Sequence, residues 1–262
     1  KTDYTNFEIV LVDHETKDTK ALNVIERFEA LKNFHKINFF GSFNFSAIIN
    51  LAAENANGDI LVLLNNDTEI VESGWLKELV SQVSRPEVGV VGALLAFKDR
   101  TIQHAGVHPD KNGFMGHGHK HLPINSSGYF SRLKAVHEVA AVTGACMAIK
   151  KSTWLDLGGL DENLAVAYND IDLCFKAREI GLKVIFTPYT KLLHHEAVSR
   201  GLDDDPETNE RLRKELEIIR TRWSSMISLD PAYNQNLSSD GGSFRISSEP
   251  TIKPIWKTLN QL

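Results

Sequence analysis

Short apolar runs rich in β-branched residues alternate along this chain with stretches that have the spacing of amphipathic helices. The apolar run at 7–13 precedes a helical pattern at 21–33, and the run at 59–65 precedes another at 74–84. Strands that alternate with helices predict an α/β fold, with a mixed, mainly parallel sheet flanked by helices. Further strands are expected at 36–40, 88–97, 183–189 and 191–196, and further helices at 45–55, 170–181 and 206–223.

Composition narrows the class of protein. The net charge of −5 and the lack of a Lys/Arg block disfavour a nucleic-acid partner. No apolar run approaches the ~18 residues of a membrane span, and the first residues lack a signal-peptide pattern. Cys146 and Cys174 both lie in apolar stretches, so we interpret them as reduced core residues. These features predict a cytoplasmic protein. A location at the inner face of the membrane is an open alternative.

Polar side chains end several of the predicted strands. Asp13 ends the first, Asn66 and Asp67 end the third, and His194 lies near the end of the last. In a parallel α/β sheet, ligands collect at the carboxyl ends of the strands. One Asp with one or two His suits a divalent cation that shares its remaining positions with phosphate oxygens. The alternative is that 65–67 caps a following helix.

Several segments follow one another in the order and spacing of a known family. They are "FEIVLVDHETKD", "FNFSAIINLAAENANGD", "ILVLLNNDTEI", "VTGACMAIKKSTWLDLGGLDE", "YNDIDLCFKAREIGLKV", "LLHHEAVSRG" and "DPAYNQNLSSDGGSF". Together they resemble glycosyltransferase family 2, which has the GT-A fold. The third is similar to the metal-binding segment of that family and the fifth to its catalytic-base helix. The last resembles a tail of members that build bacterial surface polysaccharides.

The resemblance implies an inverting transfer from a nucleoside-diphosphate sugar, such as a UDP- or dTDP-sugar, to a hydroxyl of a glycan or lipid-linked acceptor. Surface-polysaccharide and O-antigen enzymes of the rhamnosyltransferase type are the expected relatives. The leaving diphosphate needs a divalent cation, Mn²⁺ or Mg²⁺, and a single displacement needs one carboxylate base. By resemblance, Asp170 matches the base, and Asp67 and His194 match metal ligands.

The remaining site residues are also carried over by resemblance. Asn66 is expected to face the ribose or a water on the metal, and Arg200 to clamp the diphosphate. Asp13 matches the residue that reads the nucleotide base, and Asp18 is a second candidate in the same turn. Asp172 is the expected helix cap and ranks second for catalysis.

The chain departs from the family pattern in places. Asn169 stands where members often have Glu, which removes a like charge that would raise the pKa of Asp170. His14 replaces the usual Asn or Asp beside Asp13, which leaves the identity of the nucleotide base open. The strand and helix that usually begin the family's fold have no counterpart in this sequence. We therefore expect a sheet without its central strand and a fragment that is inactive or weakly active alone.

The Gly- and His-rich segment at 98–134 lacks periodicity, and long segments of this kind are usually functional or disordered. Its "HGHKH" spacing fits no structural zinc pattern, so we expect either a lining of the acceptor groove or a solvated loop.

We therefore expect a GT-A glycosyltransferase domain at 1–228 and a C-terminal tail at 229–262 that packs on it or extends from it. Two other functions stay open. One is a non-catalytic glycan-binding or scaffold domain of a larger transferase. The other is a nucleotidyltransferase, although no Gly-rich, basic phosphate loop is visible. Peripheral membrane association, further domains and a homo-oligomer are open alternatives for its partners.

Overall fold

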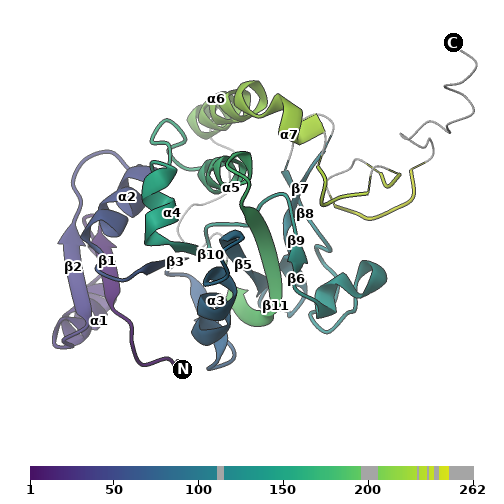
Figure 1. The fold of residues 1–262 in the computed structure, drawn as a ribbon. Helices are drawn as coiled ribbons and strands as arrows, with labels where there is room; N and C mark the ends of the chain where they lie inside the picture. Colours follow the sequence, from purple (N-terminus) through teal and green to yellow (C-terminus); the bar gives the residue numbers. More distant parts are fainter. Residues whose placement is uncertain (111–114, 196–205, 229, 235, 239–241, 248–262) are drawn as a thin grey trace, which may run out of the picture.

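The computed structural model describes residues 1–110, 115–195, 206–228, 230–234, 236–238 and 242–247. Helices cover both faces of a central sheet, which confirms the predicted α/β fold (Figure 1). The helices are α1 (Thr19–Glu29), α2 (Phe45–Asn55), α3 (Trp75–Val83), α4 (Lys151–Asp156), α5 (Asn169–Glu179), α6 (Pro206–Arg222), α7 (Ser224–Ser228) and a 3₁₀ helix, η1 (Tyr129–Lys134). Within the described residues, no helix is long and apolar enough to cross a membrane.

The central sheet is mixed. In spatial order its strands are β3 (Ile60–Leu64), β10 (Cys146–Lys150), β5 (Val88–Ala96), β11 (Lys183–His194) and β4 (Thr68–Ile70), with β6 (Ile102–His104) beside β5 and β9 (His137–Glu138) beside β11. Among these described strands, β5 and β11 run parallel, and the other pairs run antiparallel. The mixed sheet is confirmed, but the expectation that it is mainly parallel is wrong. A short connection explains one of these pairs: β6 follows β5 after only 97–101, and a parallel pair needs a crossover of about a dozen residues.

β1 (Ile9–Asp13) and β2 (Phe34–Asn38) form a separate two-stranded parallel sheet, with α1 as the crossover. This sheet lies at the left of Figure 1, and α2 contacts β1. Within the described residues, no ladder joins β1 to β3. The expectation that a central strand is missing stays a prediction.

The core lies on both faces of β5, all of whose residues are buried. Val91 packs in one apolar cluster with Leu79 of α3, and Val90 packs in the other with Phe175 of α5. Helices on both faces explain why β5 is a continuous apolar run rather than an alternating one. Cys146 and Cys174 are both free and buried, as interpreted from their apolar neighbours.

The segment at 98–134 is more ordered than the sequence suggests. It contains β6, η1 and a second small sheet of β7 (Val107–Pro109) and β8 (Met115–His117). Ile102 and His104 are almost completely buried. The expectation of a solvated loop is therefore wrong for this part, because strands of three residues are too short to show a period.

The two strands expected at 183–189 and 191–196 are one strand, β11, which ends at His194. Its pairing with β5 changes register between Thr187 and Lys191. Pro188 lies in this interval and has no N–H to donate, so the strand bulges there instead of ending.

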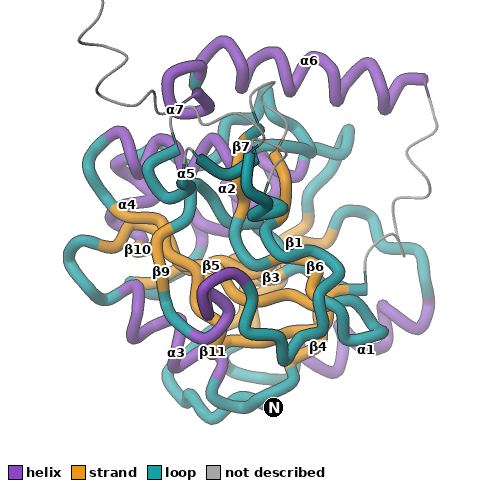
Figure 2. Tube along the Cα trace, turned by 90° about the vertical axis from the view of Figure 1, so that its right-hand side faces the viewer, coloured by secondary structure: helices purple, strands orange, loops and turns teal. Residues whose placement is uncertain are grey.

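α6 and α7 lie together at one end of the molecule, above α5 in Figures 1 and 2. The described part of the tail touches the domain: the Asp230 carboxylate lies 3.2 Å from His108 Nδ1 and 3.5 Å from Arg178 Nη1. The boundary at 228 stays a prediction.

Gly92 of β5 gives a test of this packing. A Cβ at this position would overlap the Cβ of Val142, which is fully buried. Gly92→Ala should therefore lower the free energy of unfolding by about 1–3 kcal/mol, as overpacking does. Gly58→Ala is the control, since its Cβ would come no closer than 3.4 Å to another residue. Urea unfolding checks this, and equal stability of Gly92→Ala and wild type would contradict the packing.

Candidate active site

A tight turn follows β3 and presents the first candidate side chains. The Thr68 N–H donates to the Asn65 carbonyl over 3.3 Å, and the Thr68 hydroxyl donates to the same oxygen over 2.7 Å. The next element is β4, so the alternative that 65–67 caps a helix is wrong.

The same turn is held from both sides. The Asn65 N–H donates to the Ala145 carbonyl (3.0 Å), just before β10, and the His195 N–H donates to the Asp67 carbonyl (2.9 Å), just after β11. Asp67 is thereby fixed at the carboxyl ends of β3 and β11, where the sequence places a ligand site.

Asp67 and His194 meet at this edge. His194 is the last residue of β11 and lies opposite Thr68 in the β11–β4 ladder. Its Nε2 is 3.0 Å from Asp67 Oδ1, and its Nδ1 is 2.7 Å from Gln103 Oε1. His195 lies on the other side, with Nε2 3.5 Å from Glu69 Oε2, as expected for neighbouring residues at a strand end.

The geometry of Asp67 and His194 fits a divalent cation. The two atoms are close but are not aligned as a hydrogen bond, and Asp67 Oδ1 is buried without a hydrogen-bond partner among the described residues. A carboxylate oxygen and an imidazole nitrogen are suitable ligands for Mn²⁺. Within the described residues, no third His, Cys, Asp or Glu completes such a group, so other positions would be left to substrate and water.

Asp170 lies in the first turn of α5. Its Oδ2 accepts from the Gly144 N–H (2.9 Å) and its Oδ1 from the Ile171 N–H (2.8 Å). Burial raises the pKa of Asp170, and the hydrogen bonds from Gly144 and Ile171 only partly oppose this. The helix cap is Tyr168, in the left-handed conformation, so Asp170 does not cap the helix. The Gly144 N–H donates to Asp170, and the Ala145 carbonyl accepts from the Asn65 N–H. The 144–145 segment thus contacts both Asp170 and the turn after β3.

Asn169 has a structural reason to replace an acidic residue. It is buried, and its Nδ2 donates to the carbonyls of Leu164 (3.2 Å) and Val166 (3.4 Å). A carboxylate at this position would have no proton to donate to those oxygens. The neutral amide thus holds the loop before α5, and burial raises the pKa of Asp170 without a neighbouring charge.

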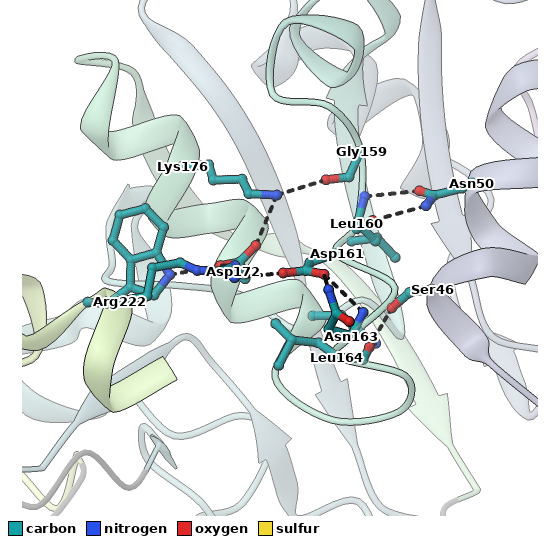
Figure 3. Close-up of polar contacts among 12 residues, drawn as sticks. Ser46, Asn50, Gly159, Leu160, Asp161, Asn163, Leu164, Asp172, Lys176 and Arg222 are labelled. Atoms are coloured by element: carbon teal, nitrogen blue, oxygen red, sulfur yellow. Dashed lines mark hydrogen bonds and ion pairs between the residues drawn. The ribbon is translucent and has the colours of Figure 1, made fainter. Parts of the chain in front are cut away.

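Asp172 does not cap the helix, contrary to expectation. Its carboxylate is fully buried and accepts from Arg222 Nη1 (2.7 Å) and Trp223 Nε1 (2.8 Å), and it pairs with Lys176 Nζ at 3.0 Å (Figure 3). Arg222 also donates to Asp161 over 2.7 Å. These contacts fasten α5 to the end of α6.

The loop before α5 is held from α2 as well. The side chain of Asn50 bonds both the carbonyl and the N–H of Leu160, each at 2.9 Å, and the Ser46 hydroxyl donates to the Leu164 carbonyl over 2.6 Å (Figure 3). The start of α5, with Asp170, is thus positioned from two sides.

The other predicted residues lie elsewhere. Asp13 ends β1 and accepts from the Thr16 N–H (3.0 Å), and hydrogen bonds from Thr16 lower its pKa. Asp18 caps α1 by accepting from the Ala21 N–H. Asn66 is exposed in the turn after β3. Arg200 lies outside the described residues.

Two histidines of the 98–134 segment, His104 and His117, form a neutral pair. His104 Nδ1 and His117 Nδ1 are 2.9 Å apart, so one nitrogen donates and the other accepts. Burial lowers the pKa of His117 to about 4 and also lowers that of His104. These two rings therefore bond to each other instead of presenting both nitrogens to solvent.

Gln103, Gly144 and Arg222 are site residues that the sequence did not indicate. Gln103 lies on a strand too short to show a period. Gly144 acts through its backbone, and Arg222 acts across a long sequence separation from Asp172. The one available signal is a lone amide among apolar neighbours in "TIQHAGV".

Comparison with solved structures identifies the fold. GalNAc-T7, solved with UDP, GalNAc and Mn²⁺, matches with a TM-score of 0.60 and 18% identity over 81% of this chain and 41% of that chain. The mannosyltransferase PcManGT from Pyrobaculum calidifontis, solved with GDP-Man and Mn²⁺, matches with a TM-score of 0.57 and 19% identity over 84% of this chain and 57% of that chain. The fold is that of the GT-A glycosyltransferases.

The family follows from sequence comparison. The model described as "Glycosyltransferase like family 2" matches residues 1–225, so the chain belongs to glycosyltransferase family 2, as the motifs predict.

Three relatives extend this comparison. The uncharacterized protein y4gI of Sinorhizobium fredii is 40% identical over 95% of this chain and 28% of its own length. The O-antigen biosynthesis protein RfbC of Myxococcus xanthus is 38% identical over 80% of this chain and 16% of its own length. The N-acetylglucosaminyl-diphospho-decaprenol L-rhamnosyltransferase of Mycobacterium tuberculosis is 24% identical over 55% of this chain and 50% of its own length. The chain thus spans half or less of each relative.

The Asp172 contacts give a stability prediction. Asp172→Ala should lower the free energy of unfolding by about 1–3 kcal/mol, because it leaves the buried Trp223 N–H without its acceptor, while Arg222 keeps its bond to Asp161. Trp223→Phe removes this hydrogen bond and replaces the indole by a smaller aromatic ring, and the lost bond should account for about 1 kcal/mol of its effect. Chemical denaturation measures both, and an Asp172→Ala variant within about 0.5 kcal/mol of wild type would rule out the role of this contact.

Proposed function

We propose that this chain is an inverting glycosyltransferase domain that uses Mn²⁺ or Mg²⁺. It transfers a sugar from a UDP- or dTDP-sugar to a hydroxyl of a glycan or lipid-linked acceptor. One observation carries the proposal. Two adjacent candidate metal ligands, Asp67 and His194, and a partly buried carboxylate, Asp170, are tied to the same edge of the sheet through 144–145.

Asp67 and His194 would hold the cation from the protein side. A bound divalent cation would neutralise the charge that develops on the leaving diphosphate. Asn66, exposed in the same turn, would face the ribose or a water on the metal, as the family pattern implies.

Asp170 would act as the general base. It takes the proton of the acceptor hydroxyl while the acceptor oxygen forms its bond to the anomeric carbon. The bond from that carbon to the diphosphate oxygen breaks, and its electron pair leaves with the nucleoside diphosphate. A raised pKa makes Asp170 a stronger base than an exposed aspartate.

The nucleotide base of the donor would bind at the end of β1. Hydrogen bonds from Thr16 keep Asp13 ionised, so its carboxylate can accept from a base N–H. Beside it, the His14 ring centroid lies 5.7 Å from those of both Phe39 and Phe43. These rings offer a face against which a base could stack.

The names of the relatives support the substrate class. GalNAc-T7 and PcManGT were solved with Mn²⁺ and a nucleotide or nucleotide sugar. RfbC is named for O-antigen biosynthesis, and the Mycobacterium tuberculosis relative is named an L-rhamnosyltransferase. We therefore place this chain in bacterial surface-polysaccharide synthesis, with rhamnose as the first donor sugar to test.

Asp170→Asn tests the proposed chemistry. The amide cannot take the acceptor proton, so we expect transfer to fall by about 10²–10⁴-fold while donor binding stays within about twofold. Asp156→Asn, which changes an exposed Asp, is the matched control. Radiolabelled transfer from dTDP- and UDP-sugars to lipid-linked glycan measures the rate, and calorimetry measures binding.

The wild-type pH profile completes this test. Because Asp170 works as a base only when deprotonated and burial raises its pKa, the transfer rate should begin to fall at a pH above 3.8, the ordinary pKa of Asp, as the pH is lowered.

Unchanged transfer in Asp170→Asn would overturn the assignment of Asp170 as the general base.

A further inference from the structure

Gln103 is a buried amide with no part in the reaction described above. It lies in the middle of β6, with 3% of its surface exposed. The strand is fixed on both sides: β5 pairs with it, and the Ile102 N–H donates to the Leu122 carbonyl over 2.7 Å. The position of the Gln103 side chain therefore follows from the backbone around it.

The contact between Gln103 and His194 defines which nitrogen of the imidazole carries the proton. Gln103 Oε1 lies 2.7 Å from His194 Nδ1, and both side chains are buried. A carbonyl oxygen can only accept, so Nδ1 must carry the hydrogen. In the neutral ring, Nε2 then has a free lone pair.

That lone pair lies beside Asp67. His194 Nε2 and Asp67 Oδ1 are 3.0 Å apart without the alignment of a hydrogen bond, as expected for two acceptor atoms that can share one cation. The other tautomer would put a hydrogen on Nε2 and block it as a ligand.

The amide nitrogen of Gln103 shows that packing alone does not explain this residue. It is buried and has no hydrogen-bond partner among the described residues. A buried donor without a partner destabilises the fold, and an apolar side chain of similar size would avoid that cost.

We propose that Gln103 is a positioning residue that holds His194 in its Nδ1–H tautomer, so that Nε2 can bind a divalent cation together with Asp67. This inference rests on the metal-dependent function proposed above. Hydrogen-bond partners of metal-binding histidines typically change metal affinity by about 10–100-fold when they are replaced.

Two variants of Gln103 test the proposal. Gln103→Met keeps the length but removes the acceptor, and should weaken Mn²⁺ binding at least tenfold, measured with Mn²⁺ alone by the EPR signal of the free ion at pH 7.5. Gln103→Glu restores an acceptor and should recover binding to within about threefold of wild type. Thermal melting without metal should show both variants folded. Equal Mn²⁺ affinity in Gln103→Met and wild type, or equal loss in both variants, would overturn the proposal.

Nitrogen NMR of the metal-free wild type gives an independent readout. The His194 signals, identified by their loss in His194→Gln, should show the Nδ1–H tautomer at pH 8, and Gln103→Met should shift them toward Nε2–H. An Nε2–H ring in wild type would overturn the inference.

Asp67→Asn separates this inference from the proposed function. If this substitution leaves Mn²⁺ binding unchanged, the assignment of the metal site to Asp67 and His194 is wrong. If it weakens binding and Gln103→Met does not, only the role of Gln103 fails.

Discussion

The parallel pair of β5 and β11 is the constraint on which the site depends. β5 is buried on both faces, and β11 pairs along it to Leu193, so His194 emerges at the carboxyl end of the sheet. The β5–β6 hairpin returns Gln103 to the same end, and the β11–β4 ladder brings Asp67 there. Side chains from distant parts of the sequence therefore meet because one buried ladder fixes where each strand ends.

Burial, more than charge, sets the chemistry of the carboxylates. Asp170 has no acidic neighbour in sequence, yet burial alone raises its pKa. Asp172, two residues on, is fully buried and paired with Arg222 and Lys176, so its charge is held in a structural role. The same short helix thus carries one carboxylate with a raised pKa, the proposed general base, and another that fastens the helix in place.

The sequence predicted the longer elements well and the short ones poorly. The helix at 45–55 was predicted with the bounds that α2 has, because a full amphipathic period is visible there and Asn44 caps it. β6 and β7 were missed because strands of three residues show no period.

At the site, the resemblance indicated Asp67, His194 and Asp170 because each belongs to a motif. It did not indicate Gln103, whose contact joins residues 91 positions apart. The general preference of Asp for helix caps led to the wrong prediction that Asp172 is a cap, since no local pattern reveals that Trp223 and Arg222 reach it.

The proposed function requires that the chain bind a nucleoside diphosphate through a cation held at Asp67. Calorimetric titration of UDP, dTDP and GDP into the chain, with and without Mn²⁺, tests it most directly, with Asp67→Asn measured beside wild type. We expect one nucleotide to bind in a Mn²⁺-dependent way and Asp67→Asn to remove this dependence. Binding that ignores both Mn²⁺ and the substitution, or no binding of any of the three nucleotides, would contradict it.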